Sequence, residues 1–245
     1  MSFLVNPYQY ASGTNAVTFD GTNDYLTHGT ALLGNSKEIT GSFWFRMNSL
    51  SQSWFFSCYD SDFSGDTVRF DCFFDSASGP LRFRGRNSSG TEILNIFSGT
   101  NISDNDWHHC AFSFDMSDTA KRHIYVDGVS DIGTIFNYTN DTLNLADANN
   151  SYVGTARTLG GTIFNGDLAE FWLASGDYTD LSSTITNFIA SSAPVGLGSD
   201  GSTPTGTQPQ IFLSGATDTW PTNDGSGGGF TENGELTTAS TQPRL

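Results

Sequence analysis

WHHCAFSFDMSDTAKRHIYVDG, residues Trp107–Gly128, is the stretch of this 245-residue chain that decides its fold. Two runs in it, Trp107–Asp115 and His123–Val126, alternate side chains with the period of a half-buried β-strand. A polar loop separates them, and Asp127-Gly128 supplies the positive φ angles of a tight turn. We therefore predict a β-hairpin at the centre of a sandwich. Its inward-facing residues are Cys110, Phe112, Phe114, Ile124 and Val126.

Runs of the same kind recur along most of the chain and predict further strands. The chain holds 20 phenylalanines and 27 glycines. Short aromatic runs between clusters of Gly, Asn, Asp and Ser are typical of antiparallel strands joined by turns. At this length one large domain can bury a sizeable core. We predict an all-β fold, an antiparallel β-sandwich, with one short helix near the carboxyl end.

The predicted helix follows Thr179-Asp180, either of which supplies a side-chain cap for its first turn. Pro194 closes the segment. Apolar residues recur with the spacing of one helix face. This stripe consists of Leu181, Ile185, Phe188 and Ile189.

Shifts in composition predict three parts. Residues 1–13 are apolar and aromatic but too short to fold alone, so we interpret them as an arm that packs on its own domain or on a neighbouring subunit. Residues 14–215 form the predicted sandwich domain. Residues 216–245 are rich in Gly and Thr. We expect them to form a largely irregular tail that lies over the sandwich or reaches a partner.

The chain is strongly acidic. It has 10 Lys+Arg against 26 Asp+Glu, which gives a formal net charge of −16 at pH 7. This charge repels a phosphate backbone and an anionic membrane surface, so we predict no nucleic-acid partner. No stretch is long and apolar enough for a membrane span, so we predict no membrane insertion.

Three cysteines, Cys58, Cys72 and Cys110, lie inside apolar strand-like runs. An odd count with this placement indicates buried thiols made in a reducing compartment, with a Cys58–Cys72 disulfide as the alternative. Met1–Pro7 lacks the basic and long apolar regions of a secretion signal. We therefore expect the protein to fold in the cytoplasm in which it is made.

Three arginines, Arg82, Arg84 and Arg86, are spaced by two residues and so share one face of a predicted strand. If a hairpin joins this strand to the preceding one, Asp71 and Asp75 lie on the same face. We predict that the arginines pair with these acids and do not form a basic binding patch.

Carbohydrate binding needs aromatic faces beside polar hydrogen-bonding groups. Trp44 and Trp172 are predicted to lie opposite the core sides of their strands. They are open to a ligand there unless the helix, the arm or the tail covers them. The candidate ligand-binding residues are Trp44, Trp54, Tyr59, Tyr125 and Trp172.

One loop has the oxygen-ligand spacing of a calcium site. The alternative is a polar hairpin loop, with the last aspartate held on a sheet face because Val68–Phe74 alternates as a strand. Calcium is therefore a candidate cofactor. The candidate metal ligands are Asp60, Asp62, Ser64, Asp66 and Asp71.

Four runs, in order along the chain, resemble the concanavalin A-like lectin/glucanase superfamily in its laminin-G-like branch. They are FDGTNDYL (19–26), WHHCAFSFD (107–115), IYVDG (124–128) and FNGDLAEFWLA (164–174). The resemblance implies a jelly-roll sandwich. It also implies that His108 and His109 are strand positions of the scaffold.

The carboxyl end carries a narrower resemblance. PVGLGSDGSTPTGTQPQIFLSG (194–215) and GGGFTENGELTTASTQP (227–243) are similar to the ends of laminin-G-like proteins from tailed phages and prophages. That group consists of virion structural or surface components. The resemblance implies a virion protein made in a host cytoplasm and displayed on the virion surface.

Catalysis is not expected. The glucanases of the superfamily share a Glu-x-Asp-x-x-Glu strand that pairs two carboxylates. Glu170, beside Asp167, is the nearest candidate, but the second catalytic glutamate is missing. No Gly-x-Ser-x-Gly run indicates a hydrolase.

Together these observations predict a non-enzymatic virion structural or surface protein of a tailed phage, attached to the head as a capsid decoration or to the tail. Its expected partners are a major capsid or tail protein and further copies of itself in a closed homo-oligomer such as a trimer. The alternative is an extracellular or virion-borne lectin, with or without calcium, that binds host or environmental glycans.

Overall fold

The central hairpin forms as its alternation predicts. Strand β8 (Trp107–Asp115) pairs antiparallel with β9 (Arg122–Val126), with Cys110 opposite Val126. Asp127 and Gly128 have φ angles of 54° and 78°, and so form the predicted tight turn into the next strand.

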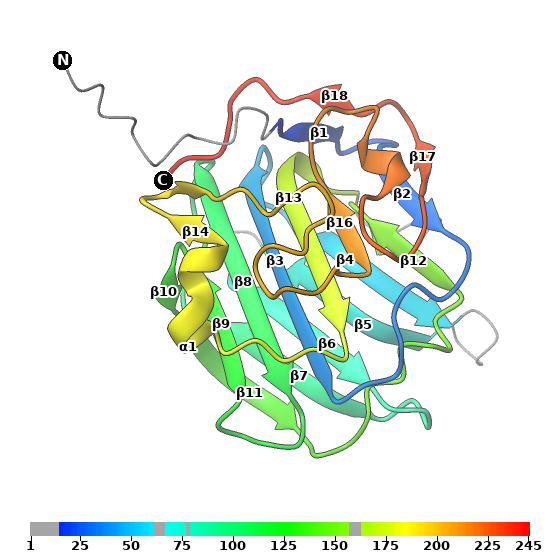
Figure 1. Cartoon of the computed structure of the whole chain (residues 1–245). Helices are drawn as coiled ribbons and strands as arrows, with labels where there is room; N and C mark the ends of the chain where they lie inside the picture. The colour runs from blue at the N-terminus through cyan, green and yellow to red at the C-terminus, as the bar shows by residue number, and fades with distance from the viewer. Residues whose placement is uncertain (1–14, 61–66, 77–78, 157–162) are drawn as a thin grey trace.

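The computed structural model describes residues 15–60, 67–76, 79–156 and 163–245. Their strands form two eight-stranded antiparallel sheets, here sheets A and B, which confirms the all-β sandwich (Figure 1). Sheet A runs β10 (Val129–Ser130), β9, β8, β3 (Glu38–Met47), β13 (Asn165–Ser175), β1 (Val17–Asp20), β18 (Thr237–Thr238), with β16 (Ile211–Leu213) also beside β13. Sheet B runs β11 (Ile132–Tyr138), β7 (Glu92–Ser98), β6 (Leu81–Arg86), β5 (Thr67–Phe74), β4 (Ser53–Asp60), β12 (Asn150–Val153), β2 (Tyr25–His28), β17 (Thr231–Asn233).

Phenylalanine side chains fill the space between the sheets. Phe43 of β3 contacts Phe55 of β4 and Phe171 of β13 at centroid distances of 4.9 and 5.5 Å. Phe83 of β6 reaches across to Phe112 of β8 at 4.7 Å. These contacts join strands far apart in sequence, so the inward phenylalanines hold the two sheets together.

The three cysteines belong to this core. Cys58, Cys72 and Cys110 are all buried and carry free thiols, as predicted. Burial raises the pKa of the Cys58 thiol to about 12, and it also raises the pKa of the other two. The thiols therefore act as small apolar groups.

The outer face of sheet A is covered. Helix α1 (Leu181–Thr184), the 3₁₀ turn η1 (Ile185–Asn187) and the pair β14 (Ile189–Ala190) and β15 (Ala193–Pro194) lie against it (Figure 1). Asp180 caps α1 by accepting a bond from the Ser182 N–H at 3.0 Å. The helix is shorter than predicted because its apolar residues continue through a 3₁₀ turn into a short strand. No helix within the described ranges has the length and apolar character needed to cross a bilayer.

The carboxyl-terminal segment differs from the predicted irregular tail. β17 pairs with β2 as the edge of sheet B, and β18 pairs with β1 as the edge of sheet A (Figure 1). Trp220, in the 3₁₀ turn η2 (Trp220–Thr222), is fully buried in the main core. Residues 216–245 are therefore part of the sandwich, and the predicted boundary at 215 is wrong. The arm at 1–13 lies outside the described residues.

Asp24 holds this segment in place, and we expect Asp24→Ala to weaken it. The buried carboxylate accepts bonds from the Glu235 N–H at 2.9 Å and the Asp20 N–H at 3.1 Å. Losing both should lower the free energy of unfolding by about 1–2 kcal/mol. It should also speed amide hydrogen exchange at residues 231–238. Exposed Asp218→Ala is the control, and unchanged exchange in Asp24→Ala would show that the segment is held by other contacts.

Candidate functional site

The hairpin formed by β5 and β6 builds the candidate site. Phe74 pairs with Leu81 and Asp71 with Arg84. This register places the three arginines of β6 on the outer face of sheet B. We call the outer surface of β4–β7 and β11 the arginine face. Its residues are Trp54, Asp71, Phe73, Asp75, Arg82, Arg84, Arg86, Glu92, Asn95, Phe97, Phe136 and Asn137.

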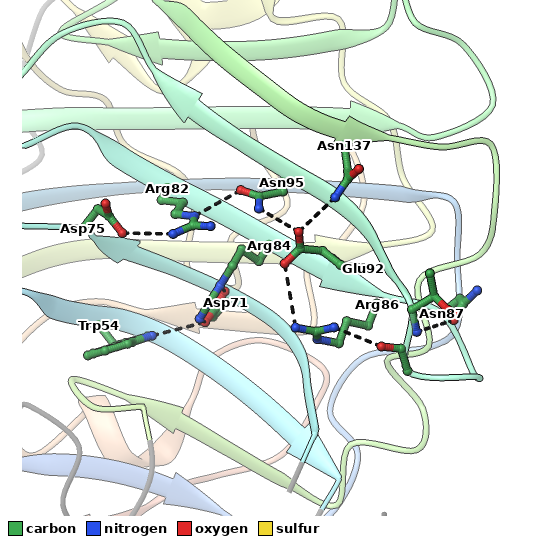
Figure 2. A network of polar contacts seen from close by, with 12 residues as sticks. Trp54, Asp71, Asp75, Arg82, Arg84, Arg86, Asn87, Glu92, Asn95 and Asn137 are labelled. Atoms are coloured by element: carbon green, nitrogen blue, oxygen red, sulfur yellow. Dashed lines mark hydrogen bonds and ion pairs between the residues drawn. The ribbon is translucent and has the colours of Figure 1, made fainter. Parts of the chain in front are cut away.

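Every arginine of this face has a carboxylate partner (Figure 2). Arg84 binds both carboxylate oxygens of Asp71, one of them through Nε at 3.0 Å. The remaining two pairs are Arg82 with Asp75 at 3.2 Å and Arg86 with Glu92 at 3.8 Å. The predicted pairing with Asp71 and Asp75 is confirmed for Arg84 and Arg82, whereas Arg86 pairs with Glu92.

Two asparagines extend the network. Arg82 Nε donates to Asn95 Oδ1 at 3.1 Å, and Asn95 Nδ2 donates to Glu92 Oε1 at 2.7 Å. Asn137, on the neighbouring strand β11, donates to the same Glu92 oxygen at 3.0 Å (Figure 2). The side chains of three strands are thus oriented before any ligand arrives.

Aromatic rings border the arginines. Trp54 stacks on Phe73 at 5.2 Å with 15° between the ring planes. The Arg84 guanidinium lies 4.6 Å from the Phe73 ring centre, and that of Arg82 lies 4.7 Å from Phe97. Both distances suit a cation–π interaction. Arg82 and Arg84 therefore lie against aromatic rings as well as being bonded to acids.

The arginine face combines a buried carboxylate with partly exposed arginine side chains. Asp71 is fully buried, whereas the side chains of Arg82, Arg84 and Arg86 are 23, 25 and 31% exposed. Burial by itself lowers the pKa of Arg84, but its hydrogen bonds and charge interaction with Asp71 outweigh burial and raise it. Arg84 therefore stays charged, and solvent reaches the guanidinium edges that face away from the acids.

Of the predicted ligand-binding aromatics, three on sheet A are covered. Trp44 and Trp172 are each 1% exposed, and Tyr125 is also buried. Trp172 packs on Phe188 and donates to the Gly201 carbonyl at 2.8 Å, while Trp44 packs against Ile189. The alternation placed these rings correctly on the outer face. That face is closed by the segment that follows β13, so the prediction that they meet a ligand is wrong.

The other two predicted aromatics lie on sheet B. Tyr59 is buried against Tyr152, with ring planes 3° apart and hydroxyl oxygens 3.0 Å apart. Trp54 is partly exposed, and its Nε1–H donates to Asp71 at 3.2 Å. Trp54 alone of the five joins the arginine face. The residues missed by sequence reasoning include Phe73, Asn95, Phe97 and Asn137, and only their alternation within strands marked them as outward.

Of the predicted calcium ligands, the two that the structure describes, Asp60 and Asp71, are bound to arginines. Both Asp71 oxygens accept from Arg84, and one also accepts from Trp54. Asp60 binds the Arg69 guanidinium at 2.8 Å. A calcium ion would have to break these pairs, so Asp71 does not fit the role. Asp62, Ser64 and Asp66 lie outside the described residues. Elsewhere in the described chain, no group of three His, Cys, Asp or Glu side chains is arranged to hold a metal.

The residues with catalytic character are engaged in structural contacts. His108 bridges Asp127 at 2.8 Å and Asp104 at 2.9 Å, which confirms its scaffold role. His109 is fully buried, with its Nε2 2.9 Å from the Ser42 hydroxyl. Burial lowers the pKa of His109 to about 3. It is therefore neutral across the physiological range.

Glu170, the remaining acid candidate, is 7% exposed, and burial raises its pKa to about 8. Its neighbour Asp167 binds Arg46 Nε at 2.7 Å and the Thr18 hydroxyl at 2.6 Å. Both carboxyl groups are buried, and Asp167 is held by Arg46 and Thr18, so the pair is not open to a glycosidic bond as the two acids of glycoside hydrolysis must be. Among the described candidate residues, those that combine hydrogen-bonding groups and ring surface open to solvent lie on the arginine face.

Comparisons with known proteins agree with this architecture. The laminin G profile described as concanavalin A-like lectin/glucanases superfamily matches residues 20–180. A heptameric SAP-like pentraxin from Limulus polyphemus superposes with a TM-score of 0.58 at 12% identity, covering 92% of this chain and 94% of that one. A Bacteroides ovatus protein, provisionally described as carbohydrate binding, gives 0.65 at 17% identity, covering 95% of this chain and 62% of that one. No curated protein sequence matches the chain. At these identities the structural likeness shows the fold.

Proposed function

The chain belongs to the concanavalin A-like lectin/glucanase superfamily, and we propose that it is a non-catalytic glycan-binding module that binds through its arginine face. One observation carries the proposal: a solvent-accessible network of arginines, carboxylates and amides lies beside partly exposed aromatic rings. The Bacteroides ovatus protein that shares this fold is provisionally described as carbohydrate binding, and this likeness supports the proposal.

These groups suit the chemistry of sugars. A sugar offers hydroxyl groups that both donate and accept, and an apolar ring face. Carboxylate and amide oxygens accept from hydroxyls, and guanidinium and amide N–H groups donate to them. Trp54 and Phe97 supply partly exposed ring surface. Because the network is already bonded within the protein, little entropy is lost in ordering it for a ligand.

Trp54→Ala should weaken glycan binding about tenfold, because the ring supplies both contact area and the support for Phe73. A glycan array identifies a ligand, and isothermal titration calorimetry measures its Kd for each variant. Trp54→Phe keeps the stack and should lose less. Asn187→Ala on the opposite side of the sandwich removes one bond, to the Pro204 carbonyl, and is the control.

Equal affinity in wild type and Trp54→Ala, with both proteins folded by circular dichroism, would place binding elsewhere. No signal for any glycan class would contradict the proposal itself. Titration in the presence of a chelator tests the calcium requirement predicted from the sequence.

We further propose that the module is displayed on a phage virion, as a head decoration or tail component. The resemblance of residues 194–215 and 227–243 to phage and prophage proteins supports this role. The buried free thiols fit assembly in a reducing cytoplasm. Mass spectrometry of density-purified phage particles should find the chain in fixed ratio to the major capsid protein. Its absence from such particles would exclude the role.

A further inference from the structure

We propose that the arginine face selects uncharged, extended oligosaccharides and discriminates against acidic ones. This inference rests on the proposed glycan binding and specifies its ligand class. It follows from how the charges of the face are paired and from the direction in which its residues are aligned.

The charges of the arginine face balance one another. Three arginines on the face meet three carboxylates, Asp71, Asp75 and Glu92, each in an ion pair. The face therefore carries no net charge, although it holds three of the ten basic residues of the chain. An anionic sugar would find no unpaired guanidinium to neutralise its charge, because each one is already paired with a carboxylate.

The net negative charge of the whole protein also acts on a charged ligand. A formal net charge of −16 disfavours the approach of an acidic glycan unless an unpaired positive patch offsets it. A neutral sugar feels no such repulsion. It can still accept hydrogen bonds from guanidinium N–H groups that have no partner in the protein. Arg82, for example, bonds Asn95 through Nε and Asp75 through Nη1, which uses two of its five N–H donors.

The side chains of the arginine face form rows that cross the strands of sheet B. One row of paired residues crosses four strands: Trp54, Phe73, Arg82 and Phe97. Trp54, Arg82 and Phe97 reach solvent in this row, whereas Phe73 is 1% exposed and supports the Trp54 ring from below. Neighbouring strands lie about 4.8 Å apart, so the row is roughly 14 Å long.

A second row runs parallel to it, two residues away on each of the strands that the rows share, β5, β6 and β7. It consists of four polar residues, Asp71, Arg84, Asn95 and Asn137. Arg84 and Asn137 are partly exposed, and the buried Asp71 and Asn95 hold the arginines in place from beneath. A ring row beside a polar row fits a chain of sugars lying across the strands, with ring faces on one side and hydroxyls on the other. A single sugar covers only part of it, so affinity should rise with chain length.

The test uses calorimetry of the full chain with two matched sets of probes, neutral oligosaccharides and carboxylated or sulfated ones, each as monomer to hexamer. We expect binding of the neutral set, strengthening with length. We also expect its Kd to change less than about twofold between about 50 and 500 mM NaCl. The acidic set should bind at least about tenfold more weakly.

Asp75→Asn gives an independent readout, since it removes one carboxylate while its side chain is 28% exposed and tolerant of change. It leaves Arg82 without an acid, so affinity for the acidic set should rise about two- to fivefold and become salt-sensitive. Asp218→Asn, exposed and away from the face, is the matched control.

Tighter binding of the acidic set by the wild type, lost in high salt, would overturn the inference while leaving glycan binding intact. Binding that does not strengthen with length would overturn the alignment of the sugar along the rows. No binding of either set is the separate failure of the proposed function.

Discussion

Glu170→Gln should raise the free energy of unfolding by roughly 3–5 kcal/mol at pH 8. Burial raises the pKa of Glu170 to about 8, and among the described residues none supplies it with a hydrogen bond or an opposite charge. The folded chain therefore binds a proton that the unfolded chain releases above pH 4.5. The stability that this proton gives is complete below pH 4.5 and is lost as the pH rises towards 8.

Glutamine is a close substitute because it keeps the shape of the side chain without the ionisation. Glu170 has a positive φ angle of 49°, at the bulge where the pairing of β13 with β3 shifts register. Glutamine adopts this strained backbone conformation at the same cost as glutamate, so the strain does not contribute to the difference. The gain should therefore shrink with falling pH and vanish near pH 4.5. Chemical denaturation at several pH values measures it, with exposed Glu235→Gln as the control. A loss of stability at pH 8 would mean that the ionised carboxylate is stabilised in the fold.

His109 should make the fold acid-sensitive, with the opposite sign to Glu170. The imidazole is buried and its pKa is lowered to about 3, so below pH 6.5 the unfolded chain binds a proton that the folded chain excludes. The stability contributed by neutral His109 is complete above pH 6.5 and falls by about 1.4 kcal/mol per pH unit down to pH 3.

Between pH 4.5 and 6.5 Glu170 and His109 change the free energy of unfolding with pH by equal and opposite amounts. In the wild type, this pair should therefore add little net pH dependence to the stability. The measurement therefore uses the Glu170→Gln background. From pH 6.5 to 5.0 this variant should lose about 2 kcal/mol, and His109→Gln in the same background should lose much less. Glutamine can still bond the Ser42 hydroxyl. Identical slopes in the two proteins would show that another group takes up the proton.

Local alternation was enough to predict part of the site. Asp71, Asp75 and the arginines of β6 come from one hairpin with a short connection, so their pairing follows once the residues are assigned to faces. Glu92, Asn95 and Asn137 join the network from later strands. Their partners depend on which strand lies beside which, and a period of two does not contain that order.

The sequence by itself determined most strands of the sandwich, the central hairpin, the inward phenylalanines, the buried thiols and the pairing of the β6 arginines with Asp71 and Asp75. All of these depend on the period of a strand or on neighbours within one hairpin. Only the tertiary structure decided what covers each outer face. Trp44 and Trp172 are outward on their strands but buried beneath chain from residues 188–201, and the last residues form edge strands instead of a tail. The physical reason is that alternation distinguishes the two faces of a strand, whereas exposure depends on segments distant in sequence that pack over one face and leave the other to solvent.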